Sequence, residues 1–195
     1  MKVNKRKKAF KFRLKLKKIT LKDAECEDTA DSLSPKGESS PIPKGKFNQT
    51  EMFNILPQLF MSGYPSAKDQ YLIKKNAISH IINLTSQHCD NVYLGKIQYT
   101  NFKLSDNSSF NLLGEIDKII NKIDKKIQKG ENVLVHCKMG VSRAPSIIIA
   151  YLIIKRGMSY NASFEWVLKI NPKIAPNLGY LMQLQNLDSK TSLFN

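Results

Sequence analysis

The segment Val133-Leu-Val-His-Cys-Lys-Met-Gly-Val-Ser-Arg-Ala-Pro-Ser146 carries the strongest structural signal in this sequence. Its apolar, β-branched start is typical of a buried strand, and Cys137 follows directly where that strand ends. A helix is expected to begin near Pro145, and residues 147–154 continue it as an apolar run that is far too short to span a membrane. A buried strand that leads through a short loop into a buried helix indicates an α/β fold.

The segments on either side alternate between strand and helix patterns. Residues 53–63 predict two short strands around a proline-containing turn, and Ser66 is expected to cap a short helix that runs to Lys75. Apolar runs at 78–84 and 98–104 predict buried strands, whereas residues 112–127 have the spacing of an amphipathic helix, which Gly130 closes. Two more helices are expected at 160–170 and 178–187. This order predicts an α/β fold with a central, mainly parallel sheet flanked by helices.

Positive charge is concentrated at the amino-terminal end of the chain. The 195 residues carry 31 Lys and Arg against 16 Asp and Glu, a formal net charge of +15. Residues 1–18 hold ten of the basic residues and no acidic one, and residues 28–46 are rich in Ser, Pro and Gly. Because such a composition buries little apolar surface, residues 1–46 are predicted to be a mostly disordered basic tail, and residues 47–195 a single folded domain.

Composition excludes several classes of protein and leaves the role of the tail open. No apolar run is long enough for a membrane span, and the sequence does not begin with the pattern of a signal peptide. Three cysteines are too few for a disulfide scaffold, which favours a reducing compartment, cytoplasmic or nuclear. The tail is compatible with a solvated segment, a signal for a nuclear import receptor at residues 5–8, or attachment to an anionic surface.

The residues between the strand and the helix are suited to binding an anion. Backbone N–H groups at the start of a helix converge on one hollow, and the helix dipole favours negative charge there. Gly140 lets the backbone curve tightly, and the planar guanidinium of Arg143 can hold two oxygens of the anion. The predicted phosphate-binding residues are Lys138, Met139, Gly140, Val141, Ser142 and Arg143.

Cys137 and Asp106 supply the groups that phosphoryl transfer needs. Loop amides and the cation of Arg143 are expected to hold Cys137 as a thiolate, with the Ser142 hydroxyl as a further donor to the sulfur. A thiolate beneath a bound phosphate is an in-line nucleophile, and the leaving oxygen then needs a proton. Asp106 follows a predicted strand and precedes Cys137 by one helix, so both are expected at the carboxyl ends of neighbouring parallel strands.

The remaining histidines, cysteines and the tryptophan are assigned structural roles. His136 is expected to order the loop beside the nucleophile, because a thiolate attacking phosphorus needs no base. His80 and His88 are predicted to be structural or exposed, and Cys89 is predicted to be buried filler. Trp166 lies among apolar residues of a predicted helix and is expected in the core. No spacing of Cys and His residues indicates a metal site.

These residues carry a family resemblance. The pattern His-Cys-x-x-Gly-x-Ser-Arg at 136–143 resembles the signature of cysteine-dependent protein phosphatases. Residues 56–63, the loop around Asp106 and residues 174–184 are similar to the opening strands, the general-acid loop and the last helix of the dual-specificity phosphatases. The catalytic loop resembles that of the slingshot-type subgroup.

The resemblance implies a specific chemistry and a class of substrate. It implies hydrolysis of phosphotyrosine and of phosphoserine or phosphothreonine in phosphorylated protein substrates, through a phosphocysteine and within a shallow pocket. It implies no metal and no organic cofactor. It also places Asn177 near the catalytic loop, in a supporting role.

Position 144 departs from the family pattern. The resemblance assigns a Ser or Thr after the arginine to stabilising the thiolate as it leaves the phosphoenzyme, and this chain has Ala144 there. Ser146 lies about 200° further around a helix of 3.6 residues per turn and is a poor substitute. We therefore expect slow breakdown of the intermediate, without an effect on phosphate binding or on the first transfer.

Three other functions remain open at this point. Lys138 and the basic tail suit a phosphoinositide headgroup, although Val141 stands where lipid-specific relatives usually have a second lysine. The net charge suits an RNA 5′-phosphatase, although no aromatic-rich basic patch is present for stacking bases. Ala144 is compatible with a phosphoprotein-binding module of low turnover, against which the retained nucleophile, arginine and acid argue.

Overall fold

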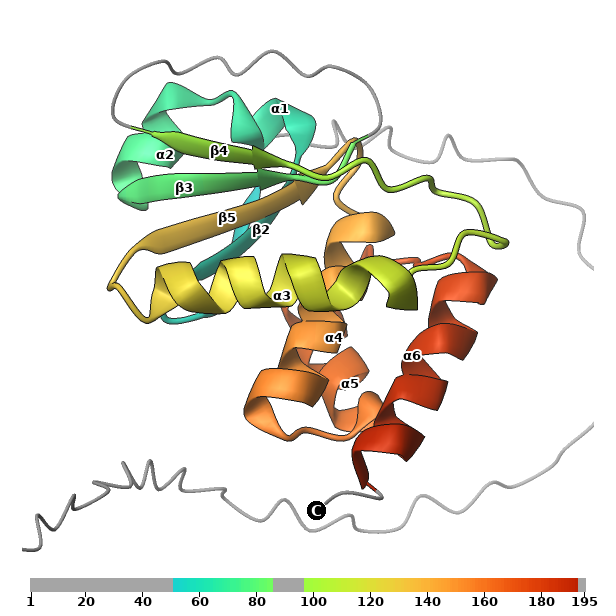
Figure 1. Cartoon of the computed structure of the whole chain (residues 1–195). Coiled ribbons are helices and arrows are strands. Elements are labelled where there is room, and N and C mark those ends of the chain that lie inside the picture. Colours follow the sequence, from blue (N-terminus) through green and yellow to red (C-terminus); the bar gives the residue numbers. More distant parts are fainter. Residues whose placement is uncertain (1–50, 86–96, 193–195) are drawn as a thin grey trace, which may run out of the picture. The chain divides into compact units, whose positions relative to one another are not determined.

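The computed structural model describes residues 51–85 and 97–192. The predicted tail, the predicted domain boundary at residue 47, and the predictions for His88 and Cys89 lie outside these residues. Within them the chain folds into one mixed sheet with helices on both faces (Figure 1). The predicted α/β fold with a central, mainly parallel sheet flanked by helices is confirmed.

The sheet has five strands among the described residues, in the spatial order β1-β2-β5-β3-β4. The strands are β1 (Met52–Leu56), β2 (Leu59–Gly63), β3 (Ile78–Asn83), β4 (Gln98–Asn101) and β5 (Asn132–Cys137). β1 pairs with β2 in antiparallel orientation across the predicted turn, whereas the β2–β5, β5–β3 and β3–β4 pairs are parallel. The carboxyl ends of β3, β4 and β5 therefore meet at one edge of the sheet.

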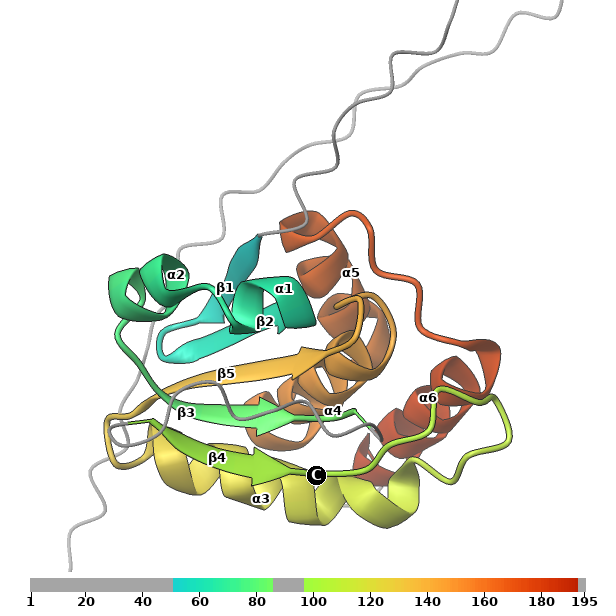
Figure 2. The ribbon, with the colours of Figure 1, turned by 90° about the horizontal axis from the view of Figure 1, so that it is seen from above.

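The helices divide between the two faces of the sheet. They are α1 (Tyr64–Ala67), α2 (Gln70–Lys75), α3 (Leu113–Ile127), α4 (Arg143–Arg156), α5 (Tyr160–Ile170) and α6 (Leu178–Ser192). α1 and α2 cover one face, and α3 to α6 lie on the other (Figures 1 and 2). None of the helices in the described ranges is long and apolar enough to cross a membrane.

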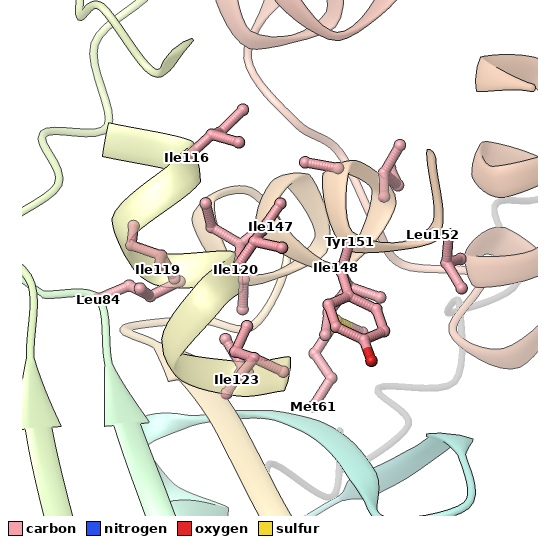
Figure 3. Close-up of a cluster of buried hydrophobic side chains, with 14 of the residues drawn as sticks. Met61, Leu84, Ile116, Ile119, Ile120, Ile123, Ile147, Ile148, Tyr151 and Leu152 are labelled. Atoms are coloured by element: carbon pink, nitrogen blue, oxygen red, sulfur yellow. The ribbon is translucent and has the colours of Figure 1, made fainter. Parts of the chain in front are cut away.

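β5 lies in the middle of the sheet and is buried on both faces. Val133 and Val135 point into the larger hydrophobic core, and Leu134, between them, belongs to the smaller core under α1 and α2. This alternation follows from the two-residue period of a strand. In the larger core, isoleucines of α3 meet the apolar side chains of α4 (Figure 3).

The segment before β3 differs from its prediction. In place of one helix capped by Ser66, the chain forms α1 and α2, and Asp69 caps the second. The Oδ1 atom of Asp69 accepts the N–H groups of Tyr71 at 2.9 Å and Leu72 at 3.1 Å. Ser66 lies inside α1 and is buried. A carboxylate three residues further along thus takes the cap position that the serine was expected to fill.

Two boundaries and one core assignment also differ from the predictions. α4 begins at Arg143, two residues before Pro145, and β4 ends at Asn101 instead of near Leu104.

The placement of Trp166 in the core was wrong, since this residue is 41% exposed. Its indole Nε1–H donates to the carbonyl oxygen of Ile55 at 3.1 Å, so the ring lies where its polar atom finds a partner at the rim of the sheet.

We expect the substitution Ile119→Ala to lower the free energy of unfolding by about 2–5 kcal/mol, because the side chain is fully buried between the sheet and α4. The neighbouring Lys118→Ala is the control, since it removes an exposed ion pair with Glu115 and is expected to cost less than about 0.5 kcal/mol. Denaturant unfolding of both variants measures the difference. Equal effects of the two substitutions would contradict this view of the core.

Candidate active site

The loop between β5 and α4 is shaped by a close approach of two backbone segments. Gly140 has φ +74°, and a Cβ at this position would lie 2.7 Å from the nitrogen of Gly63 at the end of β2. The loop therefore passes against β2 in a way that only glycine permits. The N–H of Gly140 points to Cys137 and donates to its Sγ at 3.2 Å.

Cys137 is the last residue of β5 and is almost completely buried. His136, directly before it, is buried as well, and its Nδ1 lies 3.4 Å from the carbonyl oxygen of Cys137. Burial lowers the pKa of His136 to about 4, and the nearby charge of Arg143 acts in the same direction. The imidazole is therefore neutral at neutral pH, as suits a residue that orders the loop.

Arg143 begins α4 and reaches across to the segment that follows β4. Its Nη1 donates to the carbonyl oxygen of Leu104 at 3.4 Å, and its Nε lies 3.4 Å from Oδ2 of Asp106. The guanidinium is largely buried, whereas the Asp106 side chain is 38% exposed. An arginine held in this way at the start of a helix adds a fixed positive charge to the loop amides.

Asp106 is joined to the catalytic loop by hydrogen bonds as well as by charge. Its Oδ1 accepts the hydroxyl of Ser142 at 2.6 Å and the side-chain amide of Asn177 at 3.1 Å. The structure thus brings together Asp106, Ser142, Arg143 and Asn177, all of which the sequence singled out. Two hydrogen bonds and the ion pair with Arg143 therefore hold the Asp106 carboxylate against the loop between β5 and α4.

The Ser142 hydroxyl does not have the partner that we expected. It was predicted to donate to the sulfur of Cys137, but it donates to Asp106 and accepts the backbone N–H of Asn177 at 3.3 Å. The reason is geometric, since the loop that carries Asp106 and the start of α6 both converge on this hydroxyl. Ser142 therefore connects the acid to the loop, and the donor to Cys137 Sγ among the described residues is the N–H of Gly140.

The residues around position 144 support the expectation drawn from the missing hydroxyl. Ala144 is fully buried and has no polar side-chain atom to offer. The Ser146 hydroxyl donates to the carbonyl oxygen of Ser142 at 2.8 Å, back along its own helix. Neither residue thus supplies a donor to the sulfur.

Other residues of the loop between β5 and α4 line a hollow. Lys138 and Met139 are exposed, and Val141 is partly buried. The carbonyl oxygens of Lys138 and Val141 accept the N–H groups of Tyr64 at 3.1 Å and Ala175 at 2.7 Å, which ties the loop to the neighbouring segments. The hollow has a volume of ≈340 Å³, and its walls also include residues of β1 and of the segment between α5 and α6.

The comparisons with known proteins agree with this geometry. A family model described as the catalytic domain of dual specificity phosphatases matches residues 59–190. The chain belongs to this family.

In the described residues there is no group of three or more His, Cys, Asp and Glu side chains that could hold a metal ion.

Several dual-specificity phosphatases resemble the chain over most of its folded part. It is 34% identical over 131 residues to the Protein phosphatase Slingshot of Drosophila melanogaster, a match that covers 67% of this chain and 12% of that protein. It is 30% identical over 138 residues to Dual specificity protein phosphatase 1B of Arabidopsis thaliana, covering 71% of this chain and 82% of that one. The presence of Slingshot among these relatives agrees with the resemblance of the loop.

A solved structure shows the same fold, and other relatives are longer. The crystal structure of the human tyrosine phosphatase-like serine/threonine/tyrosine-interacting protein has a TM-score of 0.67 and 29% identity, covering 73% of this chain and 99% of that one. The chain spans 27% of the length of the human Dual specificity protein phosphatase 8.

Three residues near the start of α6 contact the loop that carries Asp106 but were not among the predicted site residues. The Tyr180 hydroxyl donates to the carbonyl oxygen of Ser105, and the Gln183 Nε2 donates to that of Phe110 at 2.9 Å. Gly179 lies so close to the Ser108 backbone that no Cβ fits there. The spacing of three between positions 177, 180 and 183 was a signal that they share a helix face, but not of what the face contacts.

We expect Gly140→Ala to weaken binding of orthovanadate, a phosphate mimic, by about tenfold or more, because the new Cβ meets the β2 backbone and distorts the dual-specificity phosphatase loop. Gly157→Ala is the matched control. It has φ +64° but open space around its Cβ, so it should lower stability by about 1 kcal/mol and leave binding unchanged. Competition against an aryl phosphate measures both. Equal loss of binding in the two variants would show that the close approach is unimportant.

Proposed function

We propose that this chain hydrolyses phosphotyrosine and phosphoserine or phosphothreonine in proteins, through a phosphocysteine at Cys137. The observation that carries the proposal is the contact of Asp106 with Ser142 and Arg143, above a loop whose Gly140 amide donates to Cys137 Sγ. Nucleophile, anion cradle and acid are therefore adjacent, although the acid comes from a different part of the chain. The family relationship supports the same reaction.

In the first step, the phosphate of the substrate lies on the amides of residues 138–143, with Arg143 on its equatorial oxygens. The Cys137 thiolate attacks phosphorus in line, an S–P bond forms, and the P–O bond to the leaving group breaks. Asp106, protonated in the substrate complex, gives its proton to the departing oxygen. The loop is fixed at both ends, so its donors are already arranged for the charge that develops on the phosphoryl oxygens.

In the second step, the Asp106 carboxylate takes a proton from a water molecule that attacks phosphorus. The O–P bond forms, the S–P bond breaks, and the electron pair returns to Cys137 as thiolate. Ala144 offers that thiolate no hydroxyl, and the Ser142 hydroxyl is bonded to Asp106. Breakdown of the phosphocysteine is therefore expected to be the slow step.

We expect Asp106→Asn to lower kcat/KM for phenyl phosphate by about 10²-fold, because Asn has the same shape but no proton to give. For an aryl phosphate with a strongly activated leaving group, the rate should change little. Cys137→Ser should abolish turnover of both substrates. Asp117→Asn, an exposed carboxylate on α3, is the control and should change neither rate. Unchanged hydrolysis of phenyl phosphate by Asp106→Asn would reassign the acid.

We expect rapid mixing of the protein with an activated aryl phosphate to release a stoichiometric burst of phenol, followed by slow steady turnover. In Ala144→Ser the steady rate should rise by roughly tenfold, since one donor to the leaving thiolate is restored. Ala150→Ser places the same hydroxyl at another buried alanine of α4 and should leave the steady rate unchanged or lower it. An Ala144→Ser rate no higher than that of the wild type would make the departure at position 144 irrelevant.

A second candidate function is a phosphoprotein-binding module of low turnover. The observation that favours it is the commitment of both nearby hydroxyls, those of Ser142 and Ser146, to partners other than Cys137. Absence of both burst and turnover, in protein with a reduced thiol and an intact fold, would select this alternative over the hydrolase.

The charge and the cysteine content of the chain are the basis for proposing its partners and its location. We propose that the partners are phosphorylated proteins, and that residues 1–18 contact an anionic surface or a nuclear import receptor through their ten basic side chains. Location in the cytoplasm or nucleus is proposed from the low cysteine content.

A further inference from the structure

Tyr180 is a core residue whose hydroxyl reaches the loop that carries Asp106. It lies in the first turn of α6, its side chain is fully buried, and its hydroxyl donates to the carbonyl oxygen of Ser105. Burial raises the pKa of Tyr180 to about 12, and the charge of Asp106 acts in the same direction. The hydroxyl therefore keeps its proton throughout the neutral pH range and remains a donor to this carbonyl.

The Ser105 carbonyl belongs to the peptide unit that enters Asp106. Because a peptide unit is planar, a hydrogen bond to its oxygen restricts the orientation of the whole unit that leads into Asp106. No apolar burial holds the surrounding loop, since residues 105–109 are all exposed. Polar contacts hold it instead, among them those of Asp106 and a turn in which the Asn107 side chain accepts the N–H and hydroxyl of Ser109. Its conformation therefore depends on a few polar contacts with neighbouring elements.

The first turns of α6 and Asn177, the residue directly before this helix, supply several of these contacts. Asn177 bonds the Asp106 carboxylate itself, Gln183 bonds the Phe110 carbonyl at the far end of the loop, and Gly179 allows the Ser108 backbone to approach. Figures 1 and 2 both show the segment between β4 and α3 passing beside the start of α6. Of these contacts, the hydrogen bond of the Tyr180 hydroxyl is the one made to the backbone carbonyl directly before Asp106.

We propose that the Tyr180 hydroxyl is a positioning group for the general acid: it holds the Ser105 carbonyl so that the Asp106 carboxyl stands over the phosphate-binding loop. The proposal rests on the proposed function, because it presumes that Asp106 protonates the leaving group. Tyr180 does not touch substrate. Its hydroxyl acts through the backbone of the loop, whereas its ring packs in the core.

The test is the substitution Tyr180→Phe in the full chain, which keeps the ring and removes the hydroxyl. The measured quantity is kcat/KM for phenyl phosphate relative to kcat/KM for a strongly activated aryl phosphate. The first needs a proton on the leaving oxygen, and the second needs almost none. Since kcat/KM reports the steps up to formation of the phosphoenzyme, slow breakdown of that intermediate does not obscure the effect.

We expect the ratio to fall roughly 3- to 10-fold, which corresponds to the loss of one hydrogen bond. Because both rates come from the same sample, the ratio is independent of the fraction of protein that is folded. Tyr151→Phe is the matched control. Tyr151 is also a fully buried tyrosine with a pKa near 12, and its hydroxyl donates to Asp124 at 3.2 Å, so its loss should leave the ratio unchanged.

Two further variants separate failure of this proposal from failure of the proposed function. If Asp106→Asn lowers the ratio and Tyr180→Phe leaves it unchanged, the acid assignment stands and the positioning role is overturned. If Asp106→Asn does not lower the ratio, the acid assignment fails, and the positioning role fails with it. In the double variant the Tyr180→Phe change should have no additional effect, and an additive loss would show that the hydroxyl acts by another route.

Discussion

Burial of both ends of the catalytic loop is the constraint on which the rest of this site depends. β5 is covered on both faces of the sheet, and α4 is buried from Arg143 to Ile153, so the two ends of the loop are held by the core. Between them the chain turns at Gly140 against the backbone of β2, in a space that excludes any side chain. The amides that would bind phosphate are therefore arranged by packing, without the help of a ligand.

The segment that carries the acid is built in the opposite way. Residues 105–109 are exposed, and they are held by polar contacts from Ser142, from Asn177 and from the first turn of α6, together with the turn that Asn107 forms with Ser109. The site thus combines a rigid anion cradle with an acid loop whose position depends on a small number of hydrogen bonds. Such a loop is sensitive to the loss of a single polar side chain, because no apolar burial compensates for the hydrogen bond that is lost.

The hydroxyl groups near Cys137 are committed to partners other than its sulfur. The Ser142 hydroxyl joins the acid to the loop, the Ser146 hydroxyl bonds within α4, and position 144 has none. Support for the sulfur comes from the Gly140 amide and from the helix that begins at Arg143. Under the proposed function, this site would have the groups for binding and attack, but among the described residues no side-chain hydroxyl is shown donating to the sulfur for release of the thiolate.

Local sequence patterns were sufficient to predict the strand, loop and helix around Cys137, the amphipathic α3 and the parallel sheet. The roles proposed for Cys137, Arg143 and Asp106 also come from the sequence. The patterns succeeded because hydrophobic period and loop chemistry act over a few neighbouring residues. They missed three contacts whose partners are distant in the sequence: the Ser142 hydroxyl bonds Asp106, Trp166 bonds the Ile55 carbonyl, and Tyr180 bonds the Ser105 carbonyl. They also missed one local contact, the cap that Asp69 forms in place of Ser66. Which side chain meets which backbone group across 36 to 111 residues is decided by how the elements pack, since no short-range pattern encodes that contact.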